Sequence, residues 1–195
     1  MVNFRRSADR EQLPLPLDHV VLACGFPGSG KTYLLQLLER KHRAAGARFV
    51  VHDRMGHWQQ LPGRRVVQTA EVEEAARVAI AEAPCTLIID EAADAFPAHG
   101  WSPKRSPALN EVLKVGRQAS AVGPWRRPGP VSLLMACQRP ANVHPDVKGF
   151  LNRLYIGKFP PTATPDIEWL EDVAREPLRD VLEALPFGRF HVVYM

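Results

Sequence analysis

A glycine-rich segment near the start of the chain has the residue types that bind phosphate. Residues 25–32 read Gly-Phe-Pro-Gly-Ser-Gly-Lys-Thr and fit the pattern G-x-x-x-x-G-K-[ST] at every fixed position. The glycines let the backbone turn tightly, so that its N–H groups point inward at an anion. The Lys31 ammonium can reach the β- and γ-phosphates, and the Thr32 hydroxyl is suited to ligate Mg²⁺. The pattern predicts a site for ATP and Mg²⁺, formed by Gly25, Pro27, Gly28, Ser29, Gly30, Lys31, Thr32 and Tyr33.

Two adjacent acidic residues follow an apolar run later in the chain. Residues 85–91 read Cys-Thr-Leu-Ile-Ile-Asp-Glu, which is typical of a buried parallel strand that delivers a carboxylate to its C-terminal edge. Beside a phosphate loop, Asp90 would hold the Mg²⁺ through its water shell. Glu91 could orient and deprotonate a water for attack on the γ-phosphate, which favours hydrolysis over transfer to a second substrate. The other interpretation of Glu91 is an acid that caps a helix.

Apolar runs and helical periods alternate along the chain and would position these residues. A helix after the phosphate loop should end at Gly46 and add its N-terminal dipole to the anion site. Another should start with Thr69 as its N-cap and close before Pro84. The alternation predicts a three-layer α/β/α sandwich with a mostly parallel sheet. The expected strands are 20–24, 47–53, 65–68, 85–90, 131–138, 153–159 and 188–194, and the expected helices are 33–45, 69–83, 108–118, 142–149, 166–174 and 178–185.

The length and composition predict a single globular domain. The chain has 195 residues, of which 46% are hydrophobic and 24% charged, enough to bury a core. We expect residues 18–195 to form the ATPase domain and residues 1–17 to form an N-terminal arm, since this stretch has prolines and no strand or helix period. No apolar stretch approaches the roughly 18 to 20 residues of a membrane span, and the N-terminus lacks a signal-peptide core. These features predict a cytoplasmic protein without a transmembrane segment.

The three cysteines, Cys24, Cys85 and Cys137, lack the close pairs of a zinc site. Each lies in or beside an apolar run. We therefore expect small buried thiols in neighbouring strands, because free cysteine packs as a small hydrophobe.

Two proline-rich basic loops could contact nucleic acid. The first, 95–107, contains Trp101 beside Lys104 and Arg105, and the second, 123–130, contains Trp125 followed by two arginines. A tryptophan next to cations is the composition of a surface that grips a phosphate backbone, although charged loops also often serve only to face solvent. The formal charge of +4 permits a nucleic-acid partner without demanding one.

Four segments together resemble the FtsK/HerA superfamily of ring-forming, DNA-pumping ATPases. These are 25–32, 87–91, Gly-Arg-Gln at 116–118 and Leu-Leu-Met-Ala-Cys-Gln-Arg-Pro at 133–140. The resemblance spans residues 18–195 and implies a RecA-like P-loop core. It also implies that Gln138 senses the γ-phosphate and that Arg117 is a finger inserted into the neighbouring subunit's site. The alternatives are a strand-end amide for Gln138 and a helix C-terminal cation for Arg117.

The chain departs from that superfamily in two ways. An extra Trp-Arg-Arg loop at 125–127 makes the alignment of Arg117 less certain, and the membrane and DNA-reading domains of the chromosome-segregation pumps are not appended. This smaller motor resembles the genome-packaging ATPases of tailless, membrane-containing icosahedral viruses. That resemblance implies a homo-oligomeric ring, a hexamer, that pumps double-stranded DNA. It also implies capsid or membrane-vertex proteins as partners, in the host cytoplasm or at a virion vertex.

Two other functions fit the same motifs. A nucleotide or small-molecule kinase also fits a chain of about 200 residues, but would need an acceptor pocket and lid arginines. An ATP-driven assembly or export module that does not pump DNA is the second alternative, as in filamentous-phage export ATPases, which carry a membrane span.

Overall fold

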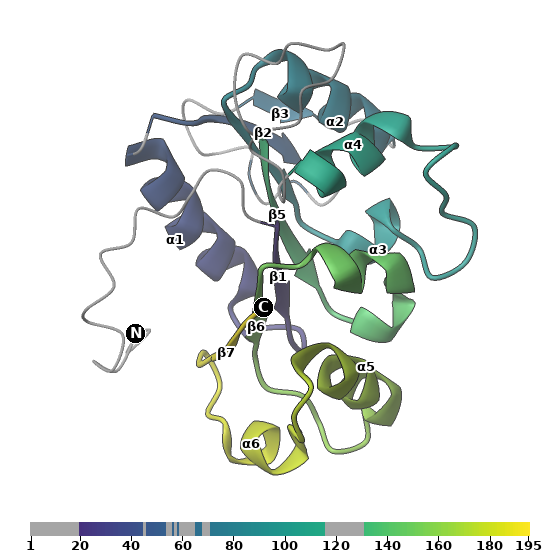
Figure 1. The fold of residues 1–195 in the computed structure, drawn as a ribbon. Coiled ribbons are helices and arrows are strands. Elements are labelled where there is room, and N and C mark those ends of the chain that lie inside the picture. The colour runs from purple at the N-terminus through teal and green to yellow at the C-terminus, as the bar shows by residue number, and fades with distance from the viewer. Residues whose placement is uncertain are drawn as a thin grey trace.

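A computed structural model describes residues 20–44, 46–53, 56, 58, 65–67, 71–115 and 131–195. Within these residues a seven-stranded sheet has the order β3-β2-β4-β5-β1-β6-β7 (Figure 1). Of these strands, β7 runs antiparallel to β6 and the other six run parallel to one another, which confirms the mostly parallel sheet. The strands are β1 (Val20–Cys24), β2 (Arg48–His52), β3 (Arg65–Val67), β4 (Cys85–Ile89), β5 (Val131–Cys137), β6 (Arg153–Ile156) and β7 (His191–Tyr194).

Helices cover both faces of the sheet. Figure 1 shows α1 on one side and α2, α4 and α5 on the other, so the predicted three-layer sandwich is confirmed. The α-helices are α1 (Lys31–Ala44), α2 (Val72–Ala81), α3 (Ala92–Ala95), α4 (Pro107–Val115), α5 (Thr164–Ala174) and α6 (Arg179–Ala184), and the 3₁₀ helices are η1 (Pro140–Asn142) and η2 (Pro145–Phe150).

Alternate residues of β1 enter two separate hydrophobic clusters. Val20 and Leu22 pack in the cluster beneath α2, α4 and α5. Val21 and Ala23 pack with Leu35 of α1 in the other. Because both faces of the strand are covered, its sequence is continuously apolar instead of alternating, as expected for a parallel strand.

The start of α2 differs from the prediction. The helix begins at Val72 with Glu71 as its N-cap, and Glu71 makes no side-chain capping bond. Thr69, the predicted N-cap, lies outside the described residues. The first residues that the helix buries are Ala75 and Ala76, about one turn after its start.

The segment predicted as a helix at 142–149 forms two short 3₁₀ helices instead. Pro140 and Pro145 each stand in the first turn of one of them. Proline is tolerated there because the first turn has no backbone partner for its missing N–H, and each new proline restarts the helix.

The strand order inserts β5 between β1 and β4. Cys24 is the register partner of Cys137, and Ile89 is that of Met135. The three strands therefore end at the same edge, with the phosphate loop after β1, Gln138 after β5 and Asp90 after β4. All three cysteines are free, buried and on these adjacent strands, as expected.

Candidate active site

The phosphate loop connects β1 to α1 at the C-terminal edge of the sheet. Gly28 and Gly30 have φ angles of 79° and 91°, a backbone conformation that side chains rarely allow. At Gly25 a Cβ would lie 2.5 Å from the Ser29 Oγ, so only glycine fits. The Gly25 N–H donates to the Cys137 carbonyl at 3.2 Å, which fastens the start of the loop to β5.

Lys31 is the first residue of α1 and is nearly buried. Its Nζ donates to the carbonyls of Gly25 and Phe26, at 2.8 and 3.1 Å. Burial lowers the pKa of Lys31, because desolvation disfavours its charged form. An anion in the loop would favour the charged form, so the residue is suited to respond to a bound phosphate.

Thr32 and Asp90 face each other across the loop. The Thr32 Oγ1 donates to the Asp90 Oδ1 at 3.1 Å, although the residues belong to α1 and to the end of β4. A hydroxyl and a carboxylate are the hard oxygen ligands that Mg²⁺ prefers, and Mg²⁺ normally completes its shell with phosphates and water. The donor set fits the predicted ion.

Glu91 has both of its carboxylate oxygens in hydrogen bonds. Oε1 accepts from the Ala93 N–H at 3.3 Å and caps α3, while Oε2 accepts from the Gln138 N–H at 3.4 Å. The capping interpretation is therefore correct. Burial nonetheless raises the pKa of Glu91, against the opposing effect of these bonds and one from the Cys137 thiol. A carboxylate with a raised pKa is a stronger base, so the two roles are compatible.

The residues that follow β5 connect the site to α5. The buried carboxylate of Asp166, in the first turn of α5, accepts from the Ala141 N–H at 3.1 Å and pairs with Arg139 at 3.8 Å. Gln138 precedes this anchor, and its exposed side chain lines the cavity described next. Of the Gln-Arg-Pro sequence, the glutamine faces the site, whereas the arginine and proline hold the chain beneath it.

A cavity of about 460 Å³ brings most of the predicted site residues together. Gly25 and Ser29 shape the loop without lining the cavity, and Arg117 lies outside the described residues. The lining residues are Pro27, Gly28, Gly30, Lys31, Thr32, Tyr33, His52, Asp90, Glu91, Asp94 and Gln138.

Sequence reasoning did not identify His52 and Asp94 as lining residues. His52 ends β2 and is the register partner of Ile89, so it stands beside the acidic pair at the same sheet edge. Asp94 lies in α3, the short helix that Glu91 caps, three residues after Glu91. The sequence does show that His52 is a polar residue at the end of a predicted strand, which is a typical position for a site residue. It does not show that this strand pairs with the strand of the acidic pair.

The first basic loop does not expose its tryptophan. Trp101 is 7% exposed, and its ring packs against Phe96 and His144 at centroid distances of 5.4 and 5.0 Å. The prediction of Trp101 as a surface for nucleic acid is wrong. Burial of the large aromatic ring against other rings stabilises the fold more than exposure of the ring to water would. Lys104 and Arg105 remain exposed. The second loop, with Trp125, lies outside the described residues.

The described residues contain neither a membrane-spanning helix nor a cluster of metal-ligating side chains. No helix in them is long and apolar enough to cross a membrane. No group of three or more His, Cys, Asp or Glu side chains in them could hold a metal ion.

A family model of the ATPases associated with various cellular activities (AAA) matches residues 21–157. The match runs from β1 to the end of β6 and covers most of the chain, so the protein belongs to this family and hydrolyses ATP. No curated protein matches the chain.

Several solved structures share the fold of this chain. The genome packaging NTPase B204 of Sulfolobus turreted icosahedral virus 2, in complex with ATP-gammaS, has a TM-score of 0.71 and 17% identity, over 92% of this chain and 94% of that one. The DNA-packaging ATPase B204 of Sulfolobus turreted icosahedral virus has a TM-score of 0.67 and 20% identity, over 90% and 91%. The conjugation coupling protein TcpA of pCW3 has a TM-score of 0.64 and 19% identity, over 91% of this chain and 58% of that one.

Proposed function

We propose that this ATPase assembles into a ring, a hexamer, and couples Mg²⁺-dependent hydrolysis to translocation of double-stranded DNA, packaging a viral genome into a preformed capsid. One observation carries the proposal. The polar residue Gln138 directly follows β5, which lies between β1 and β4, and its backbone N–H donates to Glu91. A motor needs such a link, because the state of the γ-phosphate must be passed to parts that move.

Each residue of the site has a role in this proposal. Lys31 and the loop N–H groups bind the β- and γ-phosphates, and Thr32 and Asp90 hold Mg²⁺, which supplies charge to neutralise the phosphate oxygens. Glu91 orients the attacking water and takes its proton. The Gln138 side chain reaches the γ-phosphate from the neighbouring strand end.

The contact between Gln138 and Glu91 couples sensing to catalysis. The 3.4 Å bond from the Gln138 N–H holds one oxygen of the base. A shift of Gln138 toward a bound γ-phosphate would release that oxygen for the water. The base would then be freed only when ATP is present, which limits wasteful hydrolysis.

The ring supplies the remaining charge. Arg117 of one subunit would enter the site of the next, where an arginine finger is worth about 10³ to 10⁵ in rate. The protein would act in the host cytoplasm or at a virion vertex, beside capsid or membrane-vertex proteins. The two B204 proteins are a genome packaging NTPase and a DNA-packaging ATPase, and both match over nearly their whole length, which supports this assignment.

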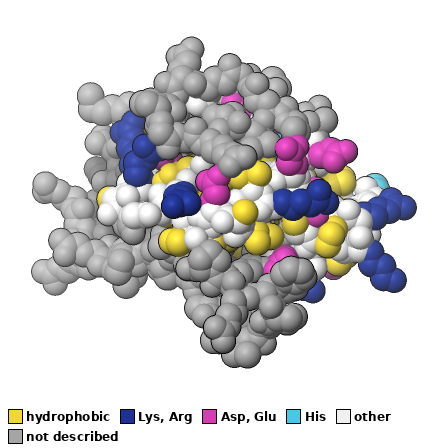
Figure 2. All heavy atoms as spheres, turned by 90° about the horizontal axis from the view of Figure 1, so that it is seen from above, with side chains coloured by type: hydrophobic (Ala, Val, Ile, Leu, Met, Phe, Trp, Pro, Cys, Tyr) yellow, Lys and Arg dark blue, Asp and Glu magenta, His cyan; other side chains and the backbone are white. Residues whose placement is uncertain are grey.

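DNA contact would be electrostatic at the first basic loop. Lys104 and Arg105 stand exposed while the tryptophan beside them is buried. Seen from above, basic side chains stand out at the margin of the molecule where the connection from α3 to α4 runs, whereas the middle of this face mixes both signs of charge (Figure 2). Lysine and arginine grip phosphates without reading sequence, as a pump for a whole genome requires.

The kinase alternative has less support. A kinase would need cations for a second phosphorylated substrate. Among the described residues that line the cavity, Lys31 is the one lysine or arginine. The export-module alternative differs from DNA pumping only in its response to DNA.

The deciding experiment is ATP hydrolysis by the purified protein, with and without double-stranded DNA, at 50 and 200 mM salt. A DNA motor should be stimulated strongly at low salt and much less at high salt. Lack of stimulation at both salts, by a preparation that hydrolyses ATP and forms rings, would exclude DNA pumping and favour the export module. Phosphate transfer to a nucleoside monophosphate would favour the kinase.

A further inference from the structure

The cavity has a second end, away from the hydrolytic residues. Asp90, Glu91 and Gln138 mark the γ-phosphate end, on the β4 and β5 side of the phosphate loop. Since β6 and β7 lie on the other side of β1, a nucleotide whose γ-phosphate meets these residues extends its nucleoside toward β6 and β7. We infer that Tyr33 and Arg189 clamp the purine base there by stacking on its two faces, an assignment that rests on the proposed ATP site.

Tyr33 supplies an exposed aromatic surface at this end. It follows Thr32 on α1, lines the cavity and is 47% exposed. No hydrogen bond joins its hydroxyl to another of the described residues. A half-exposed aromatic ring at the mouth of a nucleotide cavity gains by covering its face with another flat ring.

Arg189 is carried to the same corner by the turn before β7. The Arg189 N–H donates to the Pro186 carbonyl at 3.2 Å, and Gly188 completes the turn with a φ of 74°. The next residue, Phe190, packs against the phosphate loop: its Cε2 lies 4.0 Å from where a Cβ of Gly30 would be. This contact shows that the turn adjoins the loop.

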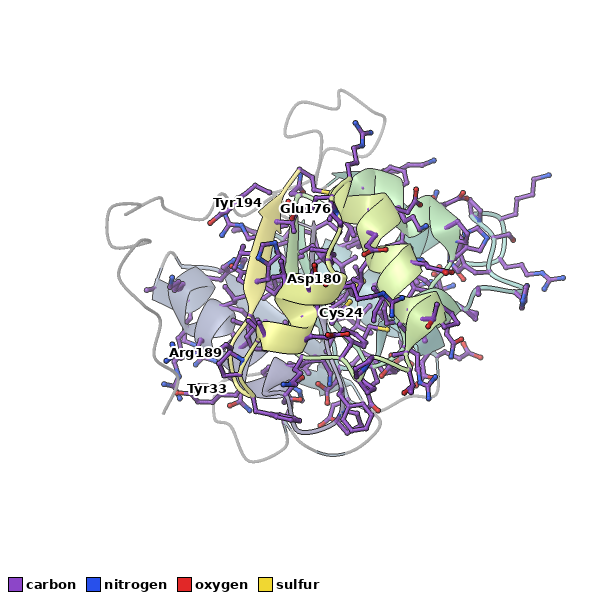
Figure 3. The ribbon with its side chains drawn as sticks, turned by 90° about the horizontal axis from the view of Figure 1, so that it is seen from below. Cys24, Tyr33, Glu176, Asp180, Arg189 and Tyr194 are labelled. Atoms are coloured by element: carbon purple, nitrogen blue, oxygen red, sulfur yellow. The ribbon has the colours of Figure 1, made fainter. Side chains whose placement is uncertain are left out.

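Figure 3 shows Arg189 and Tyr33 at the same corner of the molecule, where the C-terminal segment approaches the start of α1. Within the described part of the chain, the Arg189 guanidinium has no ion pair or hydrogen bond with another side chain. A planar cation without a partner beside an exposed ring matches the two halves of a base-stacking clamp. In the proposed site Lys31 and the N–H groups of the phosphate loop bind the phosphates. Arg189 is therefore available to contact the nucleoside.

The clamp implies a substrate range. Stacking contacts use the face of a base and tolerate its identity, whereas hydrogen bonds to the base edge discriminate. We therefore expect ATP and GTP to bind with dissociation constants within about threefold of each other. Pyrimidine triphosphates should bind more weakly, because a smaller ring covers less of the clamp.

The test is calorimetric binding of Mg²⁺ with ATP, with GTP or with inorganic tripolyphosphate. Tyr33→Ala and Arg189→Ala should each weaken ATP and GTP about fivefold to 100-fold and leave tripolyphosphate within about twofold, because that ligand has no base. Arg40→Ala, at an exposed arginine further along α1, is the matched control. Phe187→Ala removes an exposed aromatic of the same turn, whose ring already has the Lys158 Nζ 6.0 Å from its centroid, and should bind ATP normally.

Each result decides between the subsite and its rivals. Normal ATP binding by both Tyr33→Ala and Arg189→Ala overturns the clamp, as does an equal loss of tripolyphosphate, which would indicate a phosphate contact. Loss of ATP binding in Phe187→Ala instead would move the base to that ring. If the wild-type protein binds neither ATP nor tripolyphosphate, the proposed ATP site is wrong. If it binds both ligands but its ATP hydrolysis does not respond to DNA, only the proposed DNA translocation is wrong. Unchanged thermal midpoints of the unliganded variants exclude misfolding.

Discussion

The two ends of the cavity are built differently. At the γ-phosphate end, Thr32 is bonded to Asp90, and Glu91 is bonded to the backbone of Ala93 and Gln138. Asp90, Glu91 and Gln138 directly follow the buried strands β4 and β5. At the proposed nucleoside end, Tyr33 lines the cavity on the first turn of α1 and Arg189 lies nearby on a surface turn, and neither side chain has such a bond to the described residues. Chemistry needs groups that are already oriented, because reorientation adds to the barrier. Side chains that only recognise a ligand can stay mobile until the ligand binds and orders them. This ordering reduces the free energy of binding.

The sharpest way to test this contrast is Glu91→Gln. The amide keeps the capping acceptor and the shape of the side chain but cannot take a proton. Loss of a general base typically lowers turnover about 10²- to 10⁴-fold. Steady-state phosphate release should fall by that amount, while ATP binding by calorimetry remains. Normal turnover in this variant would contradict the role of Glu91 as the base.

At the nucleoside end, Arg189→Ala should act on binding more than on chemistry. Its KM for ATP should rise about tenfold, with a change in kcat below about threefold, because stacking on the base is the same in the ground and transition states. Saturation kinetics at fixed Mg²⁺ measure both constants. A fall in kcat with an unchanged KM would mean that the two ends of the cavity are not separate in function.

Outside the cavity, Lys104→Ala/Arg105→Ala tests the proposed DNA surface. Each lost phosphate contact reduces the magnitude of the slope of log affinity against log salt by about one. The slope of the double variant should therefore be smaller in magnitude by about two. Fluorescence anisotropy with duplexes of different sequence measures the slope, and all duplexes should weaken alike. Arg40→Ala/Lys41→Ala, which removes two exposed cations from α1 on the other face of the sheet, is the control. A slope unchanged from wild type would remove this loop from the DNA surface.

The smallest expected effect concerns the stability of the unliganded protein. Because burial raises the pKa of Glu91 in the folded state, the folded state binds this proton more tightly than the unfolded state. Stability from this group is present at acid pH and is lost as pH rises through the raised pKa. Glu91→Gln removes that loss, so its thermal midpoint should exceed that of the wild type by a few degrees, on the order of 2 to 4 °C, at neutral pH.

The difference should vanish well below the ordinary pKa of a glutamate, where the wild-type residue is neutral in both the folded and the unfolded state. Thermal unfolding of both proteins across a pH series, without nucleotide, gives the comparison. A neutral-pH midpoint below that of the wild type would mean that the bonds from Ala93 and Gln138 to the carboxylate outweigh its burial.

The parts of the site that sequence predicted well are those whose chemistry lies within a few consecutive residues. The phosphate loop needs glycines, a lysine and a hydroxyl in fixed order, and the acidic pair needs an apolar strand directly before it. Both patterns are local, so the backbone between their residues already sets their geometry. The fold class could be predicted for a similar reason, because each strand and each helix has its own hydrophobic pattern within consecutive residues.

Residues that depend on a distant neighbour were predicted poorly or not at all. Trp101 has the composition of a surface residue, but only the packed structure shows that Phe96 and His144 enclose it. His52 lines the cavity because β2 pairs with β4, and no local pattern states that pairing. Tyr33 and Arg189 lie near opposite ends of the chain, and the turn before β7 brings them to one corner.

The sequence by itself determined that this chain binds ATP, and it predicted the ligands of Mg²⁺ and Glu91 as the base, because each of these needs only neighbouring residues. Tertiary structure decided the strand order and, with it, that Gln138 stands between the loop and the base. The reason is physical: strand pairing is fixed by how apolar faces pack across the whole sheet, and that sum of long-range contacts is not written in any one segment.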